Sequence, residues 1–551
     1  MKKNTFVEGT LIASLSLIFI KFLGAVYVIP FYDIVGELGG ALYSYAYTVY
    51  TLVLNICTAG IPIAISKIIS EYCTLEMYDA KERTLKIGNK IVTIISSILF
   101  LAVFIFAKEL AHFLIGNATG GNTIEEIELV IRSISFCLLI VPLLAIKKGY
   151  LQGHKIISPT TNSQVIEQIV RIAIILVGSY LTINVFKLDV SIGVAISTFG
   201  AFIAGLVAYI YLEIKIRKNK KELNTHSKIK KDDVTNKSIL KKIIKYSIPL
   251  IIVSIATDIY NMTDLSLIIR GLTKIGYSGA TAETISSVIS TWASKICLIV
   301  NAIAIGLSIS LIPHMVSHYV KKEYKAINQL FNKAIGIVIV VGLPMSIGIS
   351  LLSSEIYTIF YGYSEYGNIV LKLLPFSILM TNITLIINMS LQALNKFKTI
   401  YLSTITGLLI NALLDIPLIL LFNKLGIYPY YGAIVATIIG STVSLIISLS
   451  KLKKEMDFKY KDLLKIIGKI ILPIIFMSLC VLLISYLLKD TFNTRLTMLI
   501  TCFICVIVSS IVYGIITYKN KLLNNVLGEE YINNILRKLK LKKWKNKKIK
   551  E

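Results

Sequence analysis

Residues 335–352 read IGIVIVVGLPMSIGISLL, eighteen positions without a charged side chain. A run of this length and composition approaches what a helix needs to cross about 30 Å of hydrocarbon. Similar uncharged runs occupy residues 91–107 and 470–488, and 55% of the 551 residues are hydrophobic while only 16% are charged. These proportions exclude a soluble multidomain protein and predict an all-α polytopic membrane protein.

Fourteen predicted spans follow when each apolar run must provide roughly 20 residues. The first run is taken as a retained span, because no cleavage pattern follows it. In chain order the spans cover residues 9–31, 41–66, 88–107, 129–150, 159–184, 191–214, 246–269, 284–312, 330–352, 369–393, 399–422, 430–450, 466–488 and 496–518.

The basic residues gather in alternate loops. Loops on the same side as the N-terminus contain 45 Lys and Arg residues, and the opposite loops contain seven. This positive-inside bias predicts that both termini lie in the cytoplasm. The formal charge of +27 is then explained by topology and by anionic membrane lipids as partners, so no nucleic-acid partner is expected.

An internal repeat has an offset of about 240 to 247 residues. The segment that begins at Gly60 is echoed by the one at Gly306, and the segment at Leu151 by the one at Leu391. Six spans separate each pair, so the two halves share one orientation. The repeat predicts two six-helix lobes in parallel repeat plus two C-terminal helices. The expected parts are residues 1–214 (N-terminal lobe), 215–245 (basic cytoplasmic linker), 246–450 (C-terminal lobe), 451–518 (spans 13 and 14) and 519–551 (basic cytoplasmic tail).

Three basic residues, Lys21, Arg171 and Lys295, lie near the middle of their predicted spans. A charge at that depth costs roughly 2.5 to 3.5 kcal/mol on insertion scales, so the three predict an aqueous cavity inside the bundle. Glu167 lies one helical turn before Arg171. A mutual ion pair that lowers the insertion cost and a functional role both fit this spacing.

Oxygen-bearing side chains suggest a site for an alkali cation. Asn411 and Asp415 lie one turn apart on span 11, Thr437 offers a hydroxyl from span 12, and Asp258 offers a carboxylate from span 7. Hard cations take such oxygen ligands in place of water. Asp264 is the alternative carboxylate, and interhelical hydrogen bonding is the alternative interpretation of the whole set.

Enzymatic patterns are weak in this sequence. It contains no phosphate-binding loop of the Walker type, and no nucleophile stands beside a base. A membrane-bound glycosyl- or acyltransferase would need paired carboxylates facing a loop, for which Glu125, Glu126 and Glu128 are the candidates; a solvated helix start explains them more simply. A scaffold without transport activity has no reason to retain charges deep in its spans.

Several motifs of the N-terminal half are specific. They are Lys148-Gly-Tyr-Leu-Gln-Gly-His154 with Pro159, Ser163-Gln-Val-Ile-Glu-Gln168 and Arg171, together with Lys21-Phe-Leu-Gly24, Tyr43-Ser-Tyr-Ala-Tyr47 and Gly60-Ile-Pro62 through Ser70-Glu71. These motifs resemble the Gram-positive branch of the MurJ-type lipid II flippases, in the polysaccharide biosynthesis and export family of the multidrug/oligosaccharidyl-lipid/polysaccharide superfamily. Related polysaccharide and sporulation exporters look similar.

The resemblance implies a V-shaped pair of lobes around a cationic cavity in the bacterial cytoplasmic membrane. Such a protein is a transporter and not an enzyme: it flips an undecaprenyl-pyrophosphate-linked peptidoglycan precursor, lipid II, by alternating access driven by membrane potential or sodium. No cofactor beyond a coupling Na⁺ is implied, and cell-wall synthases are implied partners. The implied substrate-binding residues are Lys21, Lys148, Gln152, Glu167, Arg171 and Lys295, and the implied sodium ligands are Asp258, Asn411, Asp415 and Thr437.

Two departures from the family pattern concern arginines. Tyr27 stands where a second arginine of span 1 is expected, and the arginine of span 2 has no counterpart near Val53 and Leu54. These departures concern individual substrate contacts.

The alternative functions are a flippase for another lipid-linked oligosaccharide, of a polysaccharide or of the sporulation cell wall, and a cation-coupled drug exporter of the same superfamily. The exporter would prefer acidic residues deep in its cavity, which the mid-span bases argue against.

Overall fold

The computed structural model describes residues 19–20, 23–24, 26–116, 118–154, 156–219, 223, 234–456, 458–488 and 494–527. Within these ranges the chain forms helices and no strand, and eleven helical segments are long and apolar enough to cross a membrane. The prediction of an all-helical polytopic membrane protein is confirmed. The predicted span 9–31 lies mostly outside the described residues, and the predicted spans 246–269 and 284–312 are not among the eleven, so a total of fourteen stays a prediction.

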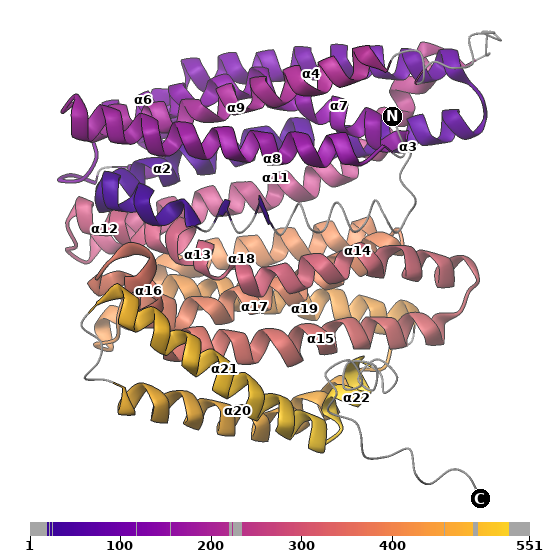
Figure 1. Ribbon diagram of the computed structural model, residues 1–551. Coiled ribbons are helices and arrows are strands. Elements are labelled where there is room, and N and C mark those ends of the chain that lie inside the picture. The colour runs from indigo at the N-terminus through magenta and orange to yellow at the C-terminus, as the bar shows by residue number, and fades with distance from the viewer. Residues whose placement is uncertain are drawn as a thin grey trace, which may run out of the picture. The chain divides into compact units, whose positions relative to one another are not determined.

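The chain divides into two compact units, which Figure 1 shows as packed bundles of helices. The first unit comprises Met1–Thr291 with Ala412–Ala433, and the second comprises Trp292–Asn411 with Ile434–Glu551. The predicted lobes, residues 1–214 and 246–450, stay a prediction.

The first unit is built mainly from ten α-helices in chain order. They are α2 (Val28–Thr58), α3 (Ile61–Thr74), α4 (Tyr78–Ile105), α5 (Ala107–Ile115), α6 (Ile124–Ser135), α7 (Val141–Gly153), α8 (Ser158–Ala173), α9 (Val190–Lys218), α11 (Asn236–Lys274) and α12 (Gly279–Ser287). The second unit contains α13 (Ala293–Ile296), α14 (Leu298–Val320), α15 (Tyr324–Leu351), α16 (Ser353–Tyr361), α17 (Glu365–Ala393), α19 (Tyr431–Met456), α20 (Lys461–Leu487), α21 (Arg495–Lys519) and α22 (Leu522–Leu527). The border between the units falls within α18 (Phe397–Lys424) and near the start of α19.

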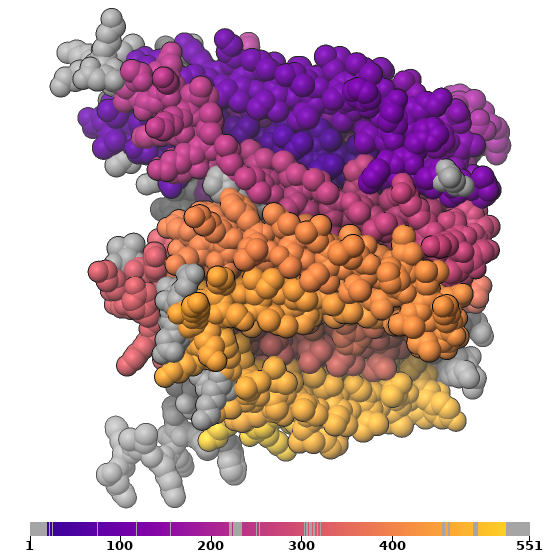
Figure 2. Space-filling model, turned by 180° about the vertical axis from the view of Figure 1, so that it is seen from behind, coloured from indigo at the N-terminus to yellow at the C-terminus, as the bar shows by residue number. Residues whose placement is uncertain are grey.

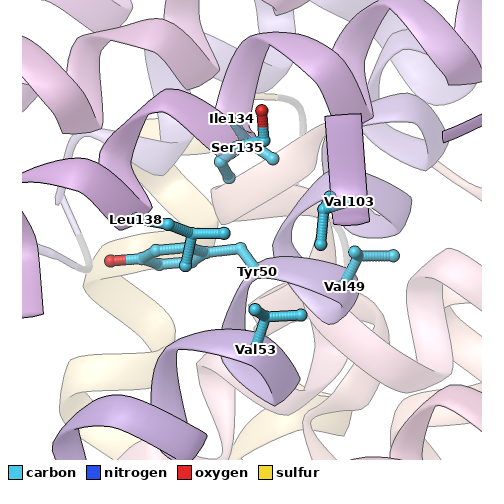
Figure 3. A pocket seen from close by; sticks show the side chains of 7 residues that line it. All are labelled: Val49, Tyr50, Val53, Val103, Ile134, Ser135 and Leu138. Carbon is cyan, nitrogen blue, oxygen red and sulfur yellow. The ribbon is translucent and has the colours of Figure 1, made fainter. Parts of the chain in front are cut away.

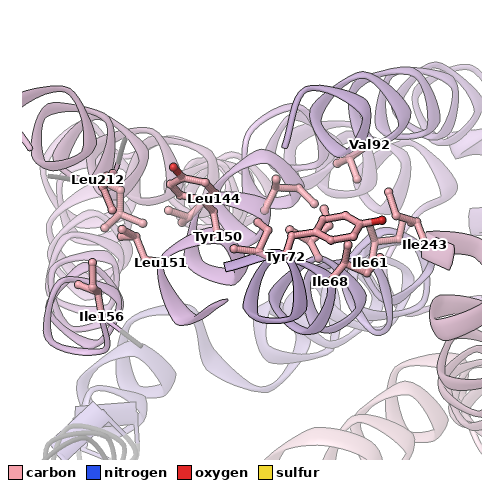
Figure 4. Close-up of a cluster of buried hydrophobic side chains, with 14 of the residues drawn as sticks. Ile61, Ile68, Tyr72, Val92, Leu144, Tyr150, Leu151, Ile156, Leu212 and Ile243 are labelled. Carbon is pink, nitrogen blue, oxygen red and sulfur yellow. The ribbon is translucent and has the colours of Figure 1, made fainter. Parts of the chain in front are cut away.

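An apolar core joins α3, α4, α7, α9 and α11 in the first unit (Figure 4). Tyr72, Leu144 and Leu212 are among its buried side chains. At Gly149 of α7 a Cβ atom would lie 2.6 Å from the carbonyl oxygen of Pro62 in α3, closer than any real side chain stands. Glycine at this position therefore lets the two helices touch backbone to backbone.

The described ends of the predicted linker 215–245 are both attached to α4. Lys81 donates a hydrogen bond to the carbonyl oxygen of Leu223 (2.8 Å), and Arg83 donates one to that of Val234 (2.7 Å). Thr235 then caps α11 by accepting from the backbone N–H of Ser238. The chain thus leaves and re-enters the described structure beside one turn of one helix.

The C-terminal helices α20 and α21 pack together and keep an apolar outer surface. Val481 of α20 and Cys505 of α21 are buried with Leu352. Phe476 and Phe503 are exposed, and both helices belong to the yellow part of the surface in Figure 2. Exposed apolar side chains on membrane-crossing helices are suited to contact with lipid tails.

Two predicted spans are interrupted where their charged residues lie. Span 8 consists of α12, a π-helical turn η4 (Val288–Trp292), α13 and α14, and Lys295 lies on the short α13. In span 5, α8 gives way to the π-helical turns η2 (Ile174–Gly178) and η3 (Leu181–Val185) just beyond Arg171. Such turns occur frequently at functional sites, so both interruptions direct attention to these two residues.

Candidate functional site

One face of α8 carries four polar side chains. Gln164, Glu167, Gln168 and Arg171 have the spacing i, i+3, i+4 and i+7, which places them on one side of a helix, and each is partly exposed. Pro159 at the start of α8 suits the first helical turn, where its missing N–H costs nothing. The buried side chains of α8 are Thr160, Thr161 and Ser163 in its first two turns, so the partly exposed polar stripe continues beyond them along the helix.

Glu167 joins two cations from two helices. Its Oε2 atom accepts a hydrogen bond from Lys148 of α7 (2.9 Å), and its Oε1 atom accepts one from Arg171 (2.7 Å). The side chains of Lys148, Glu167 and Arg171 are 16%, 13% and 22% exposed. The Glu167–Arg171 ion pair expected from the spacing is present, whereas the bond to Lys148 had no signal in the sequence.

This Lys148–Glu167–Arg171 cluster carries one net positive charge, because two cations face one carboxylate. Arg171 has five N–H donors, and Glu167 accepts from only one of its terminal nitrogens, Nη2. The Nε atom of Arg171 is buried and has no hydrogen-bond partner among the described residues. A planar guanidinium with unused donors is suited to bind phosphate oxygens.

Three tyrosines of α2 lie within electrostatic range of Arg171, namely Tyr43, Tyr47 and Tyr50. The rings of Tyr43 and Tyr47 are stacked, with centroids 6.0 Å apart and planes 11° apart. Tyr43 and Tyr50 are buried, but Tyr47 is 39% exposed. The sequence singled out residues 43 to 47 only as a family motif, although their i, i+4 spacing is a signal for stacked side chains.

A small apolar pocket lies beside Tyr50 (Figure 3). Val49, Val53, Val103 and Leu138 line it, with Ile134 and Ser135. A lining with so few polar atoms offers no recognition of a charged headgroup. We therefore assign this pocket to packing.

Lys295 lies in the second unit on an aromatic support. Its Nζ atom is 4.3 Å from the centroid of the Trp292 ring, close enough for a cation–π interaction. Trp292 is fully buried, and its carbonyl oxygen accepts a hydrogen bond from the hydroxyl of Tyr361 (2.9 Å). The lysine is thus held by side chains that are themselves fixed.

The remaining predicted substrate-binding residues are Gln152 and Lys21. Gln152 is exposed near the C-terminal end of α7. Lys21 lies outside the described residues, so its prediction has no structural counterpart.

The predicted sodium ligands lie on three helices, α11, α18 and α19. Asp258 of α11 accepts a hydrogen bond from Asn55 of α2 (2.7 Å). Asp415 of α18 is fully buried and interacts with Asp264, the alternative carboxylate, while Asn411 is buried one turn before it. Thr437 lies on α19 in the second unit. Among the described residues no group of three or more His, Cys, Asp or Glu side chains is placed to hold a metal ion.

A cluster of hydroxyl groups joins α2 to the interrupted span 8. The Oγ atom of Ser44 lies 2.6 Å from Oγ1 of Thr291 and 3.0 Å from Oγ of Ser290. Nearby in sequence, Glu283 of α12 is fully buried, and its Oε2 atom accepts from the side-chain N–H (2.6 Å) and the backbone N–H (3.2 Å) of Asn122. These contacts of Glu283, Ser290 and Thr291 all lie within the first unit, which includes the chain up to Thr291.

We expect Asn122→Ala to lower the free energy of unfolding by about 2 kcal/mol, because the buried carboxyl group of Glu283 would lose its amide donor. Thermal unfolding of purified protein measures the effect. The same change in a Glu283→Gln background should cost clearly less, since the group left without its partner is then uncharged. Equal costs in both backgrounds would contradict this role.

The comparisons with known proteins agree in both sequence and fold. Residues 6–304 match the polysaccharide biosynthesis protein family. The chain is 32% identical, over 84% of its length and 85% of the other, to the lipid II flippase MurJ of Bacillus subtilis (strain 168). It is 22% identical, over 84% and 86%, to stage V sporulation protein B of the same organism.

Two solved structures have a similar fold. The inward closed conformation of the lipid II flippase MurJ has a TM-score of 0.62 at 19% identity, covering 92% of this chain and 99% of that one. An inward-facing multidrug resistance transporter of the MATE family has a TM-score of 0.63 at 14% identity, covering 79% of this chain and 95% of that one. At these identities the likeness concerns the fold alone.

Proposed function

The chain belongs to the polysaccharide biosynthesis protein family, and from that premise we propose that it flips lipid II, an undecaprenyl-diphosphate-linked peptidoglycan precursor, across the bacterial cytoplasmic membrane. It is a multi-pass membrane transporter of the MurJ type, and no covalent step is involved. The observation that carries the proposal is the partly exposed Lys148–Glu167–Arg171 cluster within membrane-crossing helices. Deep charges of this kind mark substrate paths.

The cluster suits a diphosphate in two respects. Arg171 retains unused donors, and the cluster keeps one net positive charge that attracts an anion. At the same time Glu167 forms ion pairs with both Lys148 and Arg171. A bound diphosphate must compete with this carboxylate for the two cations, so it is released more easily. A carrier must bind its cargo on one side of the membrane and give it up on the other.

The driving force of the proposed cycle is membrane potential, a sodium gradient or both. The buried Asp415, with Asn411 on the same helix and Asp264 beside it, supports a role for a cation. A coupling ion shifts a two-state equilibrium only by its differential affinity for the two states. Sodium bound at Asp415 would bias the carrier in this way.

Reconstituted vesicles test the proposed function directly. Purified protein should move undecaprenyl-diphosphate-linked disaccharide pentapeptide from one leaflet to the other, and protein-free vesicles should not. In cells, depletion of the protein should cause lipid II to accumulate in the inner leaflet. If a different lipid-linked oligosaccharide accumulated, that compound and not lipid II would be the substrate. The similarity to a sporulation protein keeps this alternative open. Export of organic cations by the vesicles would instead indicate a drug exporter.

Both termini are proposed to lie in the cytoplasm, with the basic loops near anionic lipids and with cell-wall synthases as partners on the opposite side. In this orientation Ser44 and Thr291 lie in the outer halves of their spans. Their hydroxyl contact then belongs to the side that must open to release the substrate outward.

The double variant Ser44→Cys/Thr291→Cys should lose transport on oxidation and regain it on reduction. Oxygen atoms 2.6 Å apart lie close to the reach of a disulfide, which would prevent separation of α2 from span 8. The vesicle assay with oxidant and then with reductant measures this. Each single variant serves as the control, because the seven native cysteines are present in all of them. Full transport by the crosslinked protein would mean that this contact persists throughout the cycle.

A further inference from the structure

Tyr47 differs from its neighbours on α2. Tyr47 is 39% exposed, whereas all the remaining side chains from Ala41 to Tyr50 are buried. Tyr43 and Tyr50 flank its ring, each with a centroid 6.0 Å away. The exposed ring is therefore rigidly supported, and part of its surface is free to meet a ligand.

The surroundings of Tyr47 are polar. Arg171 lies within electrostatic range of its ring, and Glu167 and Lys148 extend the cluster from α8 and α7. Along α2, Thr51 and Asn55 follow at intervals of four residues and are partly exposed. A tyrosine among charged and polar side chains borders a path for a hydrophilic group rather than the lipid tails.

We propose that Tyr47 is a stacking platform for the first sugar ring of the substrate headgroup, beside an anion site at Arg171. This inference rests on the proposed function and names which part of the substrate the site selects. The C–H groups of a sugar ring carry partial positive charge, and the face of an aromatic ring is negative. Because the first sugar is bonded directly to the diphosphate, neighbouring sites for a ring and for a phosphate match its covalent structure.

An aromatic face also attracts organic cations, so that class of ligand must be weighed. Lys148 and Arg171 outnumber Glu167 by one charge, which opposes a cation at this place. The same excess charge favours an anion. The arrangement therefore selects lipid diphosphates that bear a sugar.

The test compares binding of two lipids to purified protein in detergent, one being undecaprenyl diphosphate with the disaccharide pentapeptide and the other bare undecaprenyl diphosphate. Tyr47→Leu should raise the dissociation constant for the sugar-bearing lipid by about tenfold, the size of an aromatic stacking contribution, and leave that for the bare lipid unchanged. Tyr47→Phe, which keeps the ring, should bind both lipids as the wild type does. Tyr180→Leu is the matched control, because Tyr180 is 52% exposed in the same unit and lies outside the cluster.

Three results of the binding experiment would overturn the platform. Unchanged binding of the sugar-bearing lipid by Tyr47→Leu would show that the ring makes no contact with it. An equal loss for both lipids would mean that the ring only supports Arg171. A loss in Tyr47→Phe as large as in Tyr47→Leu would assign the effect to the hydroxyl group. Vesicles of the wild type that move neither lipid but export tetraphenylphosphonium would refute the proposed function itself, and the platform with it.

Discussion

Lys295→Ala is expected to abolish transport while the protein remains folded. The Nζ atom of Lys295 lies 4.3 Å from the centroid of the Trp292 ring, on a short helix between interruptions of span 8. A charged hydrogen bond to a phosphate contributes about 1.5 to 3 kcal/mol, so its loss should reduce the flipping rate by on the order of a hundredfold. The vesicle assay measures the rate, and thermal unfolding measures the fold.

Lys372→Ala is the matched control for Lys295, since Lys372 is exposed on α17 in the same unit. It should transport as the wild type does. Lys21→Ala is expected to behave like Lys295→Ala, because the family resemblance implies that both lysines bind the substrate. Wild-type flipping by Lys295→Ala would remove this lysine from the proposed mechanism.

Asp415→Asn is expected to remove a stabilisation by sodium that potassium cannot provide. An ion at a hundred times its dissociation constant stabilises a protein by about 2.7 kcal/mol, which is readily seen as a thermal shift. Two carboxyl groups, those of Asp415 and Asp264, interact in a buried position, where a cation would relieve their repulsion. The measurement compares melting temperatures in sodium and in potassium at equal ionic strength.

Variants of α11 identify the second carboxylate of the proposed sodium site. Asp258→Asn and Asp264→Asn are the two to compare, since Asn55 holds the first and Asp415 faces the second. If one of these variants loses the sodium-specific shift in melting temperature, the carboxylate that it replaces is the sodium ligand. Equal shifts for sodium and potassium in the wild type, or a sodium-specific shift that persists in Asp415→Asn, would contradict the sodium site. These residues would then serve only as hydrogen-bonding groups between helices.

The sequence predicted those features that depend on spacing along one helix. Uncharged runs became membrane-crossing helices, and Glu167 and Arg171, one turn apart, form the expected ion pair. Contacts between helices were harder to predict from the sequence, because they depend on how each helix is rotated about its axis. Lys148 as the third member of the cluster and Asp264 as the carboxylate beside Asp415 are of this kind.

The interruptions of the helices could not be predicted from the sequence either. Span 8 was expected as one run over residues 284–312, but π-helical and short α-helical turns divide it around Lys295. Apolar composition fixes the depth of a segment in the membrane without fixing its hydrogen-bond register. The exposed ring of Tyr47 was missed for a related reason, since its exposure results from the packing of all its neighbours.

The hydroxyl contact of Ser44 has a consequence for the origin of the fold. Ser44 and Ser290 are 246 residues apart, the same separation as Gly60 and Gly306 in the predicted repeat. Residues that touch and are also equivalent under a repeat must lie close to the axis that relates the two copies. If the predicted repeat arose by gene duplication, this serine of the single-copy ancestor would have met its own counterpart across a symmetric dimer.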